Sequence, residues 1–347
     1  MRKIGIVAAV VFVASWMFSL LCMHAAGQAG WKMEEENQNV ISESVVYENN
    51  QKGSEETAGW NGNSHSVDQG DGEAYSRRII LERYGVRTYL SVEDYLPGVM
   101  VCQTGPEMGM EALKCQAVIA RTYIYRQMGD REEIQEEELD LDYLGDDTAR
   151  AGNTLTVHQK EELAKRLEQC RQAAEATAGV VMKYEERYIL PLFHERSAGR
   201  TRTGEADYPY LQSVESKWDV VGSESEVSIR SSEFAQRIKN FSDAPSLDPE
   251  RLSSDIQIVK RDDAGYVLQI KIGPRTYTGD DVQYALDLPS TCFTIDTRIS
   301  GTIAVTVKGC GHGYGLSQNG AQAMAEEGWS YSDILNYYYK NISLVTE

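Results

Sequence analysis

Apolar residues recur along this chain at spacings that alternate between those of helices and those of strands. The run from Glu111 to Met128 is apolar, contains no Gly or Pro and follows a segment rich in both, so a helix is expected to begin just before Glu111. Because few polar residues interrupt the run, this helix should be buried on most sides. Lys114 and Arg121 lie on one stripe of it. They either snorkel to the surface or close structural ion pairs, or else they line a groove beside the preceding loop.

The rest of the first half divides into shorter elements. One or two strands are expected within 78–89, before a loop rich in Gly and Pro around Gly98. The acidic residues 132–138 belong to a stretch that is expected to be a solvated excursion, 129–153. A helix and two paired strands should follow at 159–176, 180–184 and 188–193.

Residues 218–288 have the mixed pattern of a small inserted α/β subdomain. It carries no catalytic signature, and we assign it to shape and support. Its expected strands are 227–229, 256–259 and 266–272, and its expected helices are 232–241 and 280–286. After it, a strand at 303–308 precedes a helix that Ser317 caps and that runs through Ala325, and Ser330 caps a last helix.

The amino terminus has the pattern of a signal anchor. Two basic residues precede an uncharged stretch from Ile4 to Trp31, whose strongly apolar part is about as long as the ~20 residues that cross a bilayer. Residues 1–31 are therefore expected to be a single-pass anchor in the cell membrane, with the carboxy-terminal part extracytoplasmic. Cleavage around 24–27 is the alternative. Residues 32–76 are polar and poor in apolar side chains, which predicts a disordered linker.

The net charge limits the classes of partner, and the cysteine content limits the disulfide bonds that the chain can form. A formal net charge of −19 repels nucleic acid and offers no bulk attraction to anionic lipid. The chain has six Cys, none of them in a Cys-x-x-Cys pair and one inside the apolar segment, which argues against a full disulfide framework. Isolated buried thiols are expected, while a Cys102–Cys115 bridge stays open because it depends on distance.

The segment around the first helix carries a motif of a known family. Gly98-Val99, Glu111-Ala112-Leu113-Lys114 and Ala120-Arg121-Thr122-Tyr123 stand in the register of its core. This segment resembles the SpoIID/LytB family, the stage II sporulation protein D and amidase-enhancer proteins that act on bacterial peptidoglycan. The resemblance places Gln103 at the position of the family's catalytic Glu.

Two further motifs extend the resemblance. Phe193-His194-Glu195-Arg196-Ser197, with Thr201 after it, is similar to a strand end and loop of the family. Gly309-Cys310-Gly311-His312-Gly313-Tyr314-Gly315-Leu316-Ser317-Gln318 is similar to its glycine-rich signature. The resemblance implies an α+β fold, a mixed SpoIID-like domain over 77–347 with a buried central helix and the insertion at 218–288.

The residue types of these motifs limit the chemistry. Alternate glycines let the backbone approach another surface or a ligand and leave His312 as the titratable group presented there. His194, at a strand end, is either a structural residue or part of a site. Nucleotide binding is not expected, since the glycine-rich run has no P-loop Lys. Cys310, His312 and His194 could form a zinc site, but no Cys follows the strand, so neither a metal nor another cofactor is expected.

The resemblance implies two hypotheses of function. Active relatives are lytic transglycosylases that cut glycan strands stripped of stem peptides, and this chemistry needs a carboxylic acid of raised pKa. Gln103 cannot carry that proton. The preferred hypothesis is a membrane-tethered protein that binds glycan strands, has weak or no catalysis, and aids a cell-wall amidase or another sporulation membrane protein. The glycan groove would be lined by Gln103, Arg121, His194, Ser197, Thr201, His312, Ser317 and Gln318.

The alternative hypothesis is an active lytic transglycosylase with a displaced acid. Glu107 and Glu111 are the nearest carboxylates to Gln103 along the chain. Each also has a structural explanation, since Glu107 fits a solvated loop acid and Glu111 fits a helix start, where the dipole favours an acid.

Overall fold

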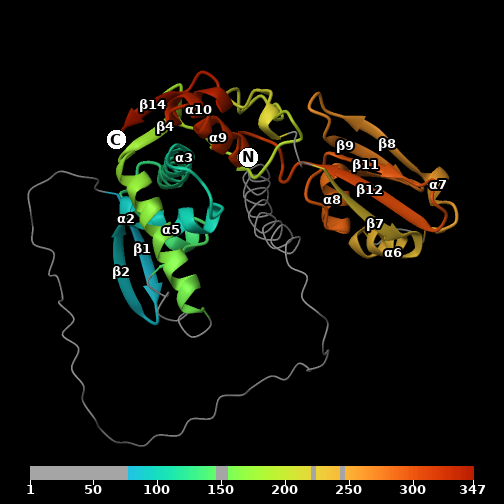
Figure 1. Ribbon diagram of the computed structural model, residues 1–347, viewed down its shortest axis with the longest axis horizontal. Coiled ribbons are helices and arrows are strands. Elements are labelled where there is room, and N and C mark those ends of the chain that lie inside the picture. Colours follow the sequence, from blue (N-terminus) through green and yellow to red (C-terminus); the bar gives the residue numbers. More distant parts are fainter. Residues whose placement is uncertain (1–76, 146–154, 220–223, 243–246) are drawn as a thin grey trace, which may run out of the picture.

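The computed structural model describes residues 77–145, 155–219, 224–242 and 247–347 (Figure 1). Helices and strands are mixed along these ranges, which confirms the expected α+β class. The anchor and linker expected at 1–31 and 32–76 lie outside the described residues. Within the described ranges, no helix has the length and apolar character needed to cross a membrane.

A three-stranded sheet opens the described chain. Of the one or two strands expected within 78–89 there are two, β1 (Arg78–Arg83) and β2 (Val86–Ser91), which form an antiparallel hairpin, and β3 (Glu133–Gln135) pairs with β1 in parallel. β3 lies in the acidic run that we expected to be a solvated excursion, and for these residues that expectation is wrong. The reason is that Ile134 and Leu139 are buried in the core, which draws the acidic run onto the protein surface.

α2 (Val92–Gln103) is a helix where we expected a loop around Gly98, so that prediction is wrong. Ser91 caps the helix by accepting a hydrogen bond from a backbone N–H of the first turn at 3.0 Å. Pro97 disfavours an isolated helix, but nine of the twelve residues are buried. Gly98 permits this packing because a Cβ there would lie 2.4 Å from the Tyr143 ring. Tertiary burial therefore overrides local propensity.

α3 (Met110–Met128) is the central helix, and it confirms the buried helix expected from Glu111. Two hydrophobic clusters meet along it. Val118 belongs to one, which continues into the carboxy-terminal helices, and Ala117 belongs to the other, which continues into α2. α5 (Val157–Glu175), the helix expected at 159–176, packs against both α2 and α3.

A second three-stranded sheet packs against α3 in the order β14-β4-β5. Its strands are β14 (Ser343–Thr346), β4 (Val180–Tyr184) and β5 (Arg187–Tyr188). β4 lies where a strand was expected, but the partner expected at 188–193 is interrupted after Tyr188. The break has a physical reason, because Pro191 has no N–H to donate to a ladder.

After that break, β6 (Phe193–His194) pairs in parallel with β13 (Leu316–Ser317), which joins the two later sequence motifs. α9 (Gln318–Glu326) follows directly, and the Ser317 hydroxyl caps it by accepting a backbone N–H at 3.1 Å. α10 (Tyr331–Tyr338) is capped by Ser330. Both expected caps are confirmed.

The insertion forms a body of its own, at the right of Figure 1. Its elements are β7 (Glu224–Arg230), α6 (Ser231–Ser242), α7 (Leu252–Asp255), β8 (Ile256–Arg261), β9 (Val267–Ile272), β10 (Arg275–Thr278), α8 (Gly279–Leu286), β11 (Phe293–Asp296) and β12 (Thr302–Lys308). The sheets have the orders β10-β9-β8 and β11-β12-β7, and one hydrophobic cluster joins them. Phe293 and Val307 belong to this cluster, so the boundary expected at 288 falls inside it.

The glycine-rich segment 309–315 turns tightly against β6. Gly311 has a φ of +100°, and a Cβ there would lie 2.8 Å from the Cβ of His194. Gly315 has a φ of +69°, and a Cβ there would lie 1.8 Å from the carbonyl oxygen of Leu192. Alternate glycines do let the backbone approach another surface, as expected, and that surface is the chain itself.

Substituting one of these glycines tests how closely the segment is packed. We expect Gly315→Ala to lower the free energy of unfolding by more than about 3 kcal/mol, because a methyl group displaces a backbone carbonyl. Gly328→Ala is the matched control, since Gly328 has a φ of +90° but a methyl group there would meet no atom within 4 Å. In this control the free energy of unfolding should fall only by the backbone strain, about 1–2 kcal/mol. Urea denaturation of both variants checks this, and equal losses would contradict it.

Candidate functional site

Three glutamine side chains form a buried amide network where the first and third motifs meet. Gln103 ends α2, Gln116 lies on α3 and Gln318 begins α9. Gln116 donates from Nε2 to Oε1 of Gln103 at 2.6 Å. Gln318 donates from Nε2 to the carbonyl oxygen of Gln103 at 2.8 Å and to Oε1 of Gln116 at 3.2 Å. All three side chains are nearly excluded from solvent, so the network ties the two motifs together from inside.

A buried carboxylate, Asp219, organises the other half of the site. Its Oδ2 accepts hydrogen bonds from the N–H and the hydroxyl of Ser197 at 3.1 and 2.6 Å. Its Oδ1 accepts from the Ser317 hydroxyl and from Nδ2 of Asn319, both at 3.0 Å. Asp219 itself has no exposed surface. Because four donors converge on it, the carboxylate orients the second and third motifs rather than facing a ligand.

His194 and His312 lie together, with ring centroids 5.8 Å apart. Nδ1 of His194 donates to the carbonyl oxygen of Tyr314 at 3.1 Å, which leaves Nε2 as a buried acceptor without a partner among the described residues. Nδ1 of His312 accepts the Tyr314 N–H at 3.0 Å. The backbone of Tyr314 thus selects one tautomer for each ring.

Burial governs the charge of both rings. It lowers the pKa of His194 to about 4, although the negative charge of Asp219 and the hydrogen bond to Tyr314 act to raise it. Burial also lowers the pKa of His312 well below its usual value, and the nearby His194 and Arg202 lower it further. Both imidazoles are therefore neutral near pH 7, so they carry no charge that would attract an anion, and they take up a proton only well below neutral pH.

The insertion supports the segment that presents His312. Arg202 pairs with Asp262 of the insertion at 2.6 Å and donates to the carbonyl oxygen of His312 at 3.3 Å. Its guanidinium also lies over the rings of Tyr266 and Tyr314, at 4.9 and 4.4 Å from their centroids. These contacts fix the backbone of the glycine-rich segment from the side of the insertion.

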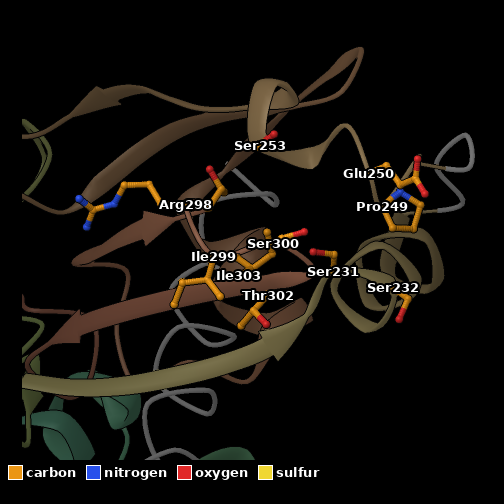
Figure 2. A pocket seen from close by; sticks show the side chains of 12 residues that line it. Ser231, Ser232, Pro249, Glu250, Ser253, Arg298, Ile299, Ser300, Thr302 and Ile303 are labelled. Atoms are coloured by element: carbon orange, nitrogen blue, oxygen red, sulfur yellow. The ribbon is translucent and has the colours of Figure 1, made fainter.

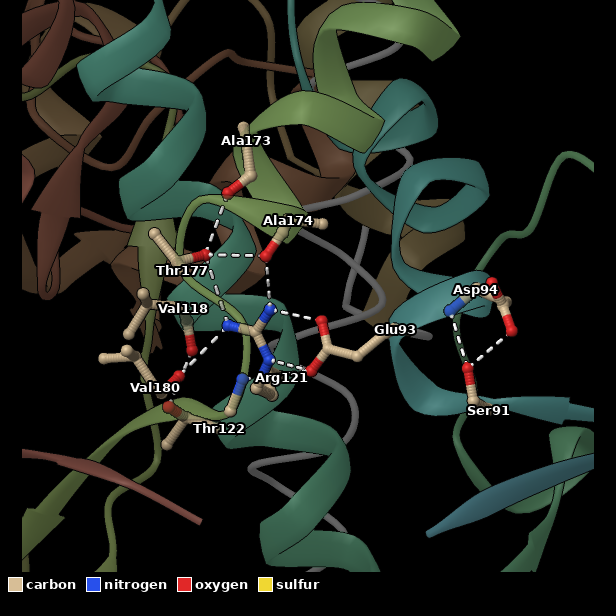
Figure 3. A network of polar contacts seen from close by, with 11 residues as sticks. Ser91, Glu93, Asp94, Val118, Arg121, Thr122, Ala173, Ala174, Thr177 and Val180 are labelled. Carbon is tan, nitrogen blue, oxygen red and sulfur yellow. Dashed lines mark hydrogen bonds and ion pairs between the residues drawn. The ribbon is translucent and has the colours of Figure 1, made fainter. Parts of the chain in front are cut away.

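Arg121 does not line a groove, and its expected role in binding is corrected by its contacts (Figure 3). The side chain is fully buried and pairs with both carboxylate oxygens of Glu93 in α2, at 2.7 and 2.6 Å. It also donates to the carbonyl oxygens of Ala174 and Val180, both at 3.1 Å. Of the alternatives for this stripe, the structural ion pair is the one that forms, because a charge without water requires a full set of partners.

The two displaced-acid candidates differ in their surroundings. Glu111 pairs with Lys114 at 2.6 Å and accepts the Tyr331 N–H at 2.7 Å. Burial raises the pKa of Glu111, but the hydrogen bonds from Lys114 and Tyr331 and the charge of Lys114 outweigh burial and lower it. Glu107 is exposed in the loop after α2. Neither is a desolvated carboxyl group of the kind that a general acid needs.

The remaining candidates are packed inside the junction. Thr201 is buried, and its hydroxyl accepts the Val214 N–H at 2.9 Å. His194 and Ser197 have no exposed surface, and Gln103 is only 7% exposed. The structure therefore brings the three motifs together, and most of their side chains pack inside this junction, where Gln318 keeps only 6% of its surface exposed. His312 alone among the expected histidines keeps part of its surface exposed.

Sequence reasoning missed two residues that hold this junction. Gln116 had a usable signal, because it is one of the few polar residues that interrupt the apolar run of α3, and it is uncharged. Asp219 had none, since it lies at the edge of the expected insertion, in the 3-10 helix η2 (Lys217–Asp219). Its partners become apparent only when Ser197 and Ser317 are seen to lie on either side of it.

The described residues also bear on a metal site, on the disulfide bridge and on cavities. No cluster of three or more His, Cys, Asp or Glu side chains in them is arranged to hold a metal ion. Cys102 and Cys115 are both free thiols, so the bridge that the sequence left open is not formed. A polar depression of about 700 Å³ lies in the insertion, where Ser231 and Ser300 are among its lining residues (Figure 2). None of the site residues expected from the sequence lines it.

Comparisons with known proteins match most of the chain. A family model described as stage II sporulation protein, SpoIID, matches residues 82–184. Stage II sporulation protein D of Bacillus amyloliquefaciens is 31% identical over 264 residues, with 74% of each chain covered. The protein of that name from Bacillus subtilis is 31% identical over 271 residues, again with 74% of each covered. The amidase enhancer of Bacillus subtilis is 25% identical over 309 residues, which cover 72% of this chain and 40% of the enhancer.

Removing the buried guanidinium tests whether Arg121 is a structural residue. We expect Arg121→Met to lower the free energy of unfolding by about 3–5 kcal/mol, because Glu93 is left without its partner. Arg171→Met is the matched control, since Arg171 makes an exposed ion pair with Glu168 at 2.9 Å. It should cost less than about 1 kcal/mol. Denaturant midpoints measure both, and a small loss in Arg121→Met would contradict the structural role.

The low pKa of His194 predicts a pH-dependent stability. As pH falls, the unfolded chain takes up the proton near pH 6.5 and the folded chain only near pH 4, so stability is full above pH 6.5 and decreases between these values. The loss should reach at most about 3 kcal/mol. His194→Gln should flatten this part of the profile, measured as denaturant midpoints from pH 7.5 to 4.5. His158→Gln, at an exposed position, is the control. An equal slope of stability against pH in the wild type and in His194→Gln would refute the prediction.

Proposed function

The chain belongs to the SpoIID family of stage II sporulation proteins, and from this membership we propose that it binds the glycan strands of peptidoglycan and assists cell-wall remodelling in sporulation, with weak or no catalysis of its own. The observation that carries the proposal is the environment of Gln103. This residue stands where the resemblance puts the catalytic Glu, and its side chain and backbone are bonded to two other amides. An amide in that place can hold a hydrogen bond but cannot supply a proton.

The surroundings of the nearby carboxylates support binding over catalysis. A general acid needs a pKa raised by burial, whereas the pKa of Glu111 is lowered by its contacts with Lys114 and Tyr331. Asp219 is buried, but four donors already occupy its oxygens. An active lytic transglycosylase with Glu107 or Glu111 as its acid is therefore the less favoured function.

The proposed setting rests on the apolar amino-terminal residues and on the relatives. The apolar residues before Trp31 anchor the protein in the cell membrane, and the domain after the linker faces the wall. One relative is named an amidase enhancer. We therefore place a cell-wall amidase among the partners, since an amidase strips stem peptides and so produces the bare glycan that this protein would bind.

Binding and catalysis are separated by one assay. The full-length chain is incubated with sacculi whose stem peptides an amidase has removed. We expect the protein to co-sediment with the glycan and to release no anhydro-sugar products. Release of such products by the wild-type chain would establish the alternative, and failure to co-sediment would overturn glycan binding.

Restoring a carboxyl group at the central position tests why catalysis is absent. In Gln103→Glu the new carboxyl group keeps a donor in Gln116, and burial raises its pKa, as a general acid requires. We expect release of anhydro-sugar products at least about 100-fold above the wild-type level. Gln127→Glu, an exposed change on the same helix as Gln116, is the control. Equal activity in all three proteins would count against Gln103 as the cause.

A further inference from the structure

Three aromatic side chains from distant parts of the sequence form a cluster at the surface, which we call the aromatic triad: Trp218, Trp329 and Tyr337. Trp218 lies in η2, Trp329 precedes α10 and Tyr337 lies in α10. Their ring centroids are 5.9 to 6.5 Å apart, and all three pairs meet edge to face. Each ring packs against the core cluster of the carboxy-terminal helices but keeps part of its surface exposed.

Polar contacts fix the orientation of the triad. Nε1 of Trp218 donates to Oε1 of Glu327 at 2.7 Å, and the Tyr337 hydroxyl donates to the carbonyl oxygen of Glu215 at 2.6 Å. The polar edges of these two rings are therefore already engaged. What they offer to a partner is apolar ring surface held in one geometry, which costs little conformational entropy on binding.

Two lysines add positive charge to the triad. Nζ of Lys217 lies 4.9 Å from the Trp218 ring centroid, and Nζ of Lys340 lies 5.0 Å from that of Tyr337. The acids that face the triad are Glu327, whose Oε1 is 3.7 Å from Lys217, and Glu215 beside Tyr337. The positive charge of Arg200 also lies close enough to Tyr337 to act on the pKa of its hydroxyl group. Three cations against two acids give this site a positive balance in a chain of net charge −19, and this balance favours a partner that carries negative charge between apolar surfaces.

The triad is connected directly to the buried junction. Trp218 precedes Asp219, and its carbonyl oxygen accepts a hydrogen bond from Nδ2 of Asn319 at 3.3 Å. The same amide group donates to Asp219 at 3.0 Å. The residues that bring the second and third motifs together therefore also set the position of Trp218 at the surface.

We propose that the aromatic triad, with Lys217 and Lys340, is the surface on which this protein holds peptide-stripped glycan. The inference rests on the proposed function and names the surface at which the glycan binds. The apolar faces of the sugars and their acetamido methyl groups pack on the rings. Removal of the stem peptide leaves a free lactyl carboxylate on every second sugar, and these carboxylates meet the lysines. Ring surface and cations side by side match a polymer in which apolar faces and carboxylates alternate.

Two polymers separate the contributions of rings and charges. The full-length chain is titrated with peptide-stripped glycan strands and with chitin oligosaccharides, which share the acetamido sugars but lack the lactyl carboxylate. We expect the wild-type chain to prefer the stripped glycan. Trp329→Ala should weaken binding to both polymers by at least about tenfold, as loss of an aromatic anchor does. The double variant Lys217→Gln and Lys340→Gln should lose the preference and its salt dependence while it keeps the affinity for chitin.

Matched substitutions outside the triad show whether a loss of binding is specific to it. Tyr284→Ala removes an aromatic side chain that is 75% exposed on α8, and Lys260→Gln removes an exposed lysine on β8; both should bind as wild type does. Tyr337→Phe keeps the ring and should stay within about twofold. The lysine variant leaves the ring packing intact, so it decides the question even where Trp329→Ala does not fold.

The outcomes distinguish this inference from the function on which it rests. If the wild-type chain binds neither polymer, the proposed function fails, and the assignment of the triad fails with it. If the wild-type chain binds stripped glycan and the ring and lysine variants bind it equally well, glycan binding stands but the triad is not its site. Retained glycan binding together with lost binding of a purified amidase would assign the triad to a protein partner and overturn our assignment.

Discussion

A guanidinium group that is removed from water must be surrounded by protein acceptors, and the rest of this fold depends on how Arg121 meets that requirement. Its partners come from α2, from the end of α5 and from the start of β4, so one side chain of the central helix holds three other elements. Glu93 also accepts the Gly179 N–H at 3.2 Å, which adds a further contact between α2 and the residue before β4. Because Glu93 lies in the first turn of α2, this pair sets the alignment of the helix whose last residue is Gln103.

Buried polar groups also join the sequence motifs to one another. The amide network links Gln103 to the start of α9, and Asp219 links the loop after β6 to the same helix start. Apolar contacts are tolerant of small shifts, whereas a hydrogen-bonded network is satisfied in one arrangement only. The insertion adds to this arrangement because Arg202 and Asp262 hold the glycine-rich segment from outside. The exact arrangement of the motifs is therefore set by hydrogen bonds and ion pairs more than by apolar packing.

The family resemblance places Gln103 at the position of a catalytic Glu, and the amide network shows how the packing of this chain accommodates an amide there. The amide oxygen of Gln103 accepts the hydrogen bond from Gln116 as a carboxylate oxygen would, but an amide has no acidic proton to give. A closely packed junction of this kind is suited to shaping a surface. The aromatic surface at Trp218 begins one residue from the carboxylate that organises the junction.

The sequence by itself determined the features that depend on neighbouring residues. The apolar run predicted α3, the caps Ser317 and Ser330 predicted two helix starts, and alternate glycines predicted a close backbone approach. Only the tertiary structure decided that Arg121 is structural and that Asp219 joins the motifs. The physical reason is distance along the chain: a cap or a positive φ is satisfied within a few residues, whereas the Asp219 carboxylate finds the Ser317 hydroxyl 98 positions away, and no local pattern records such a partner.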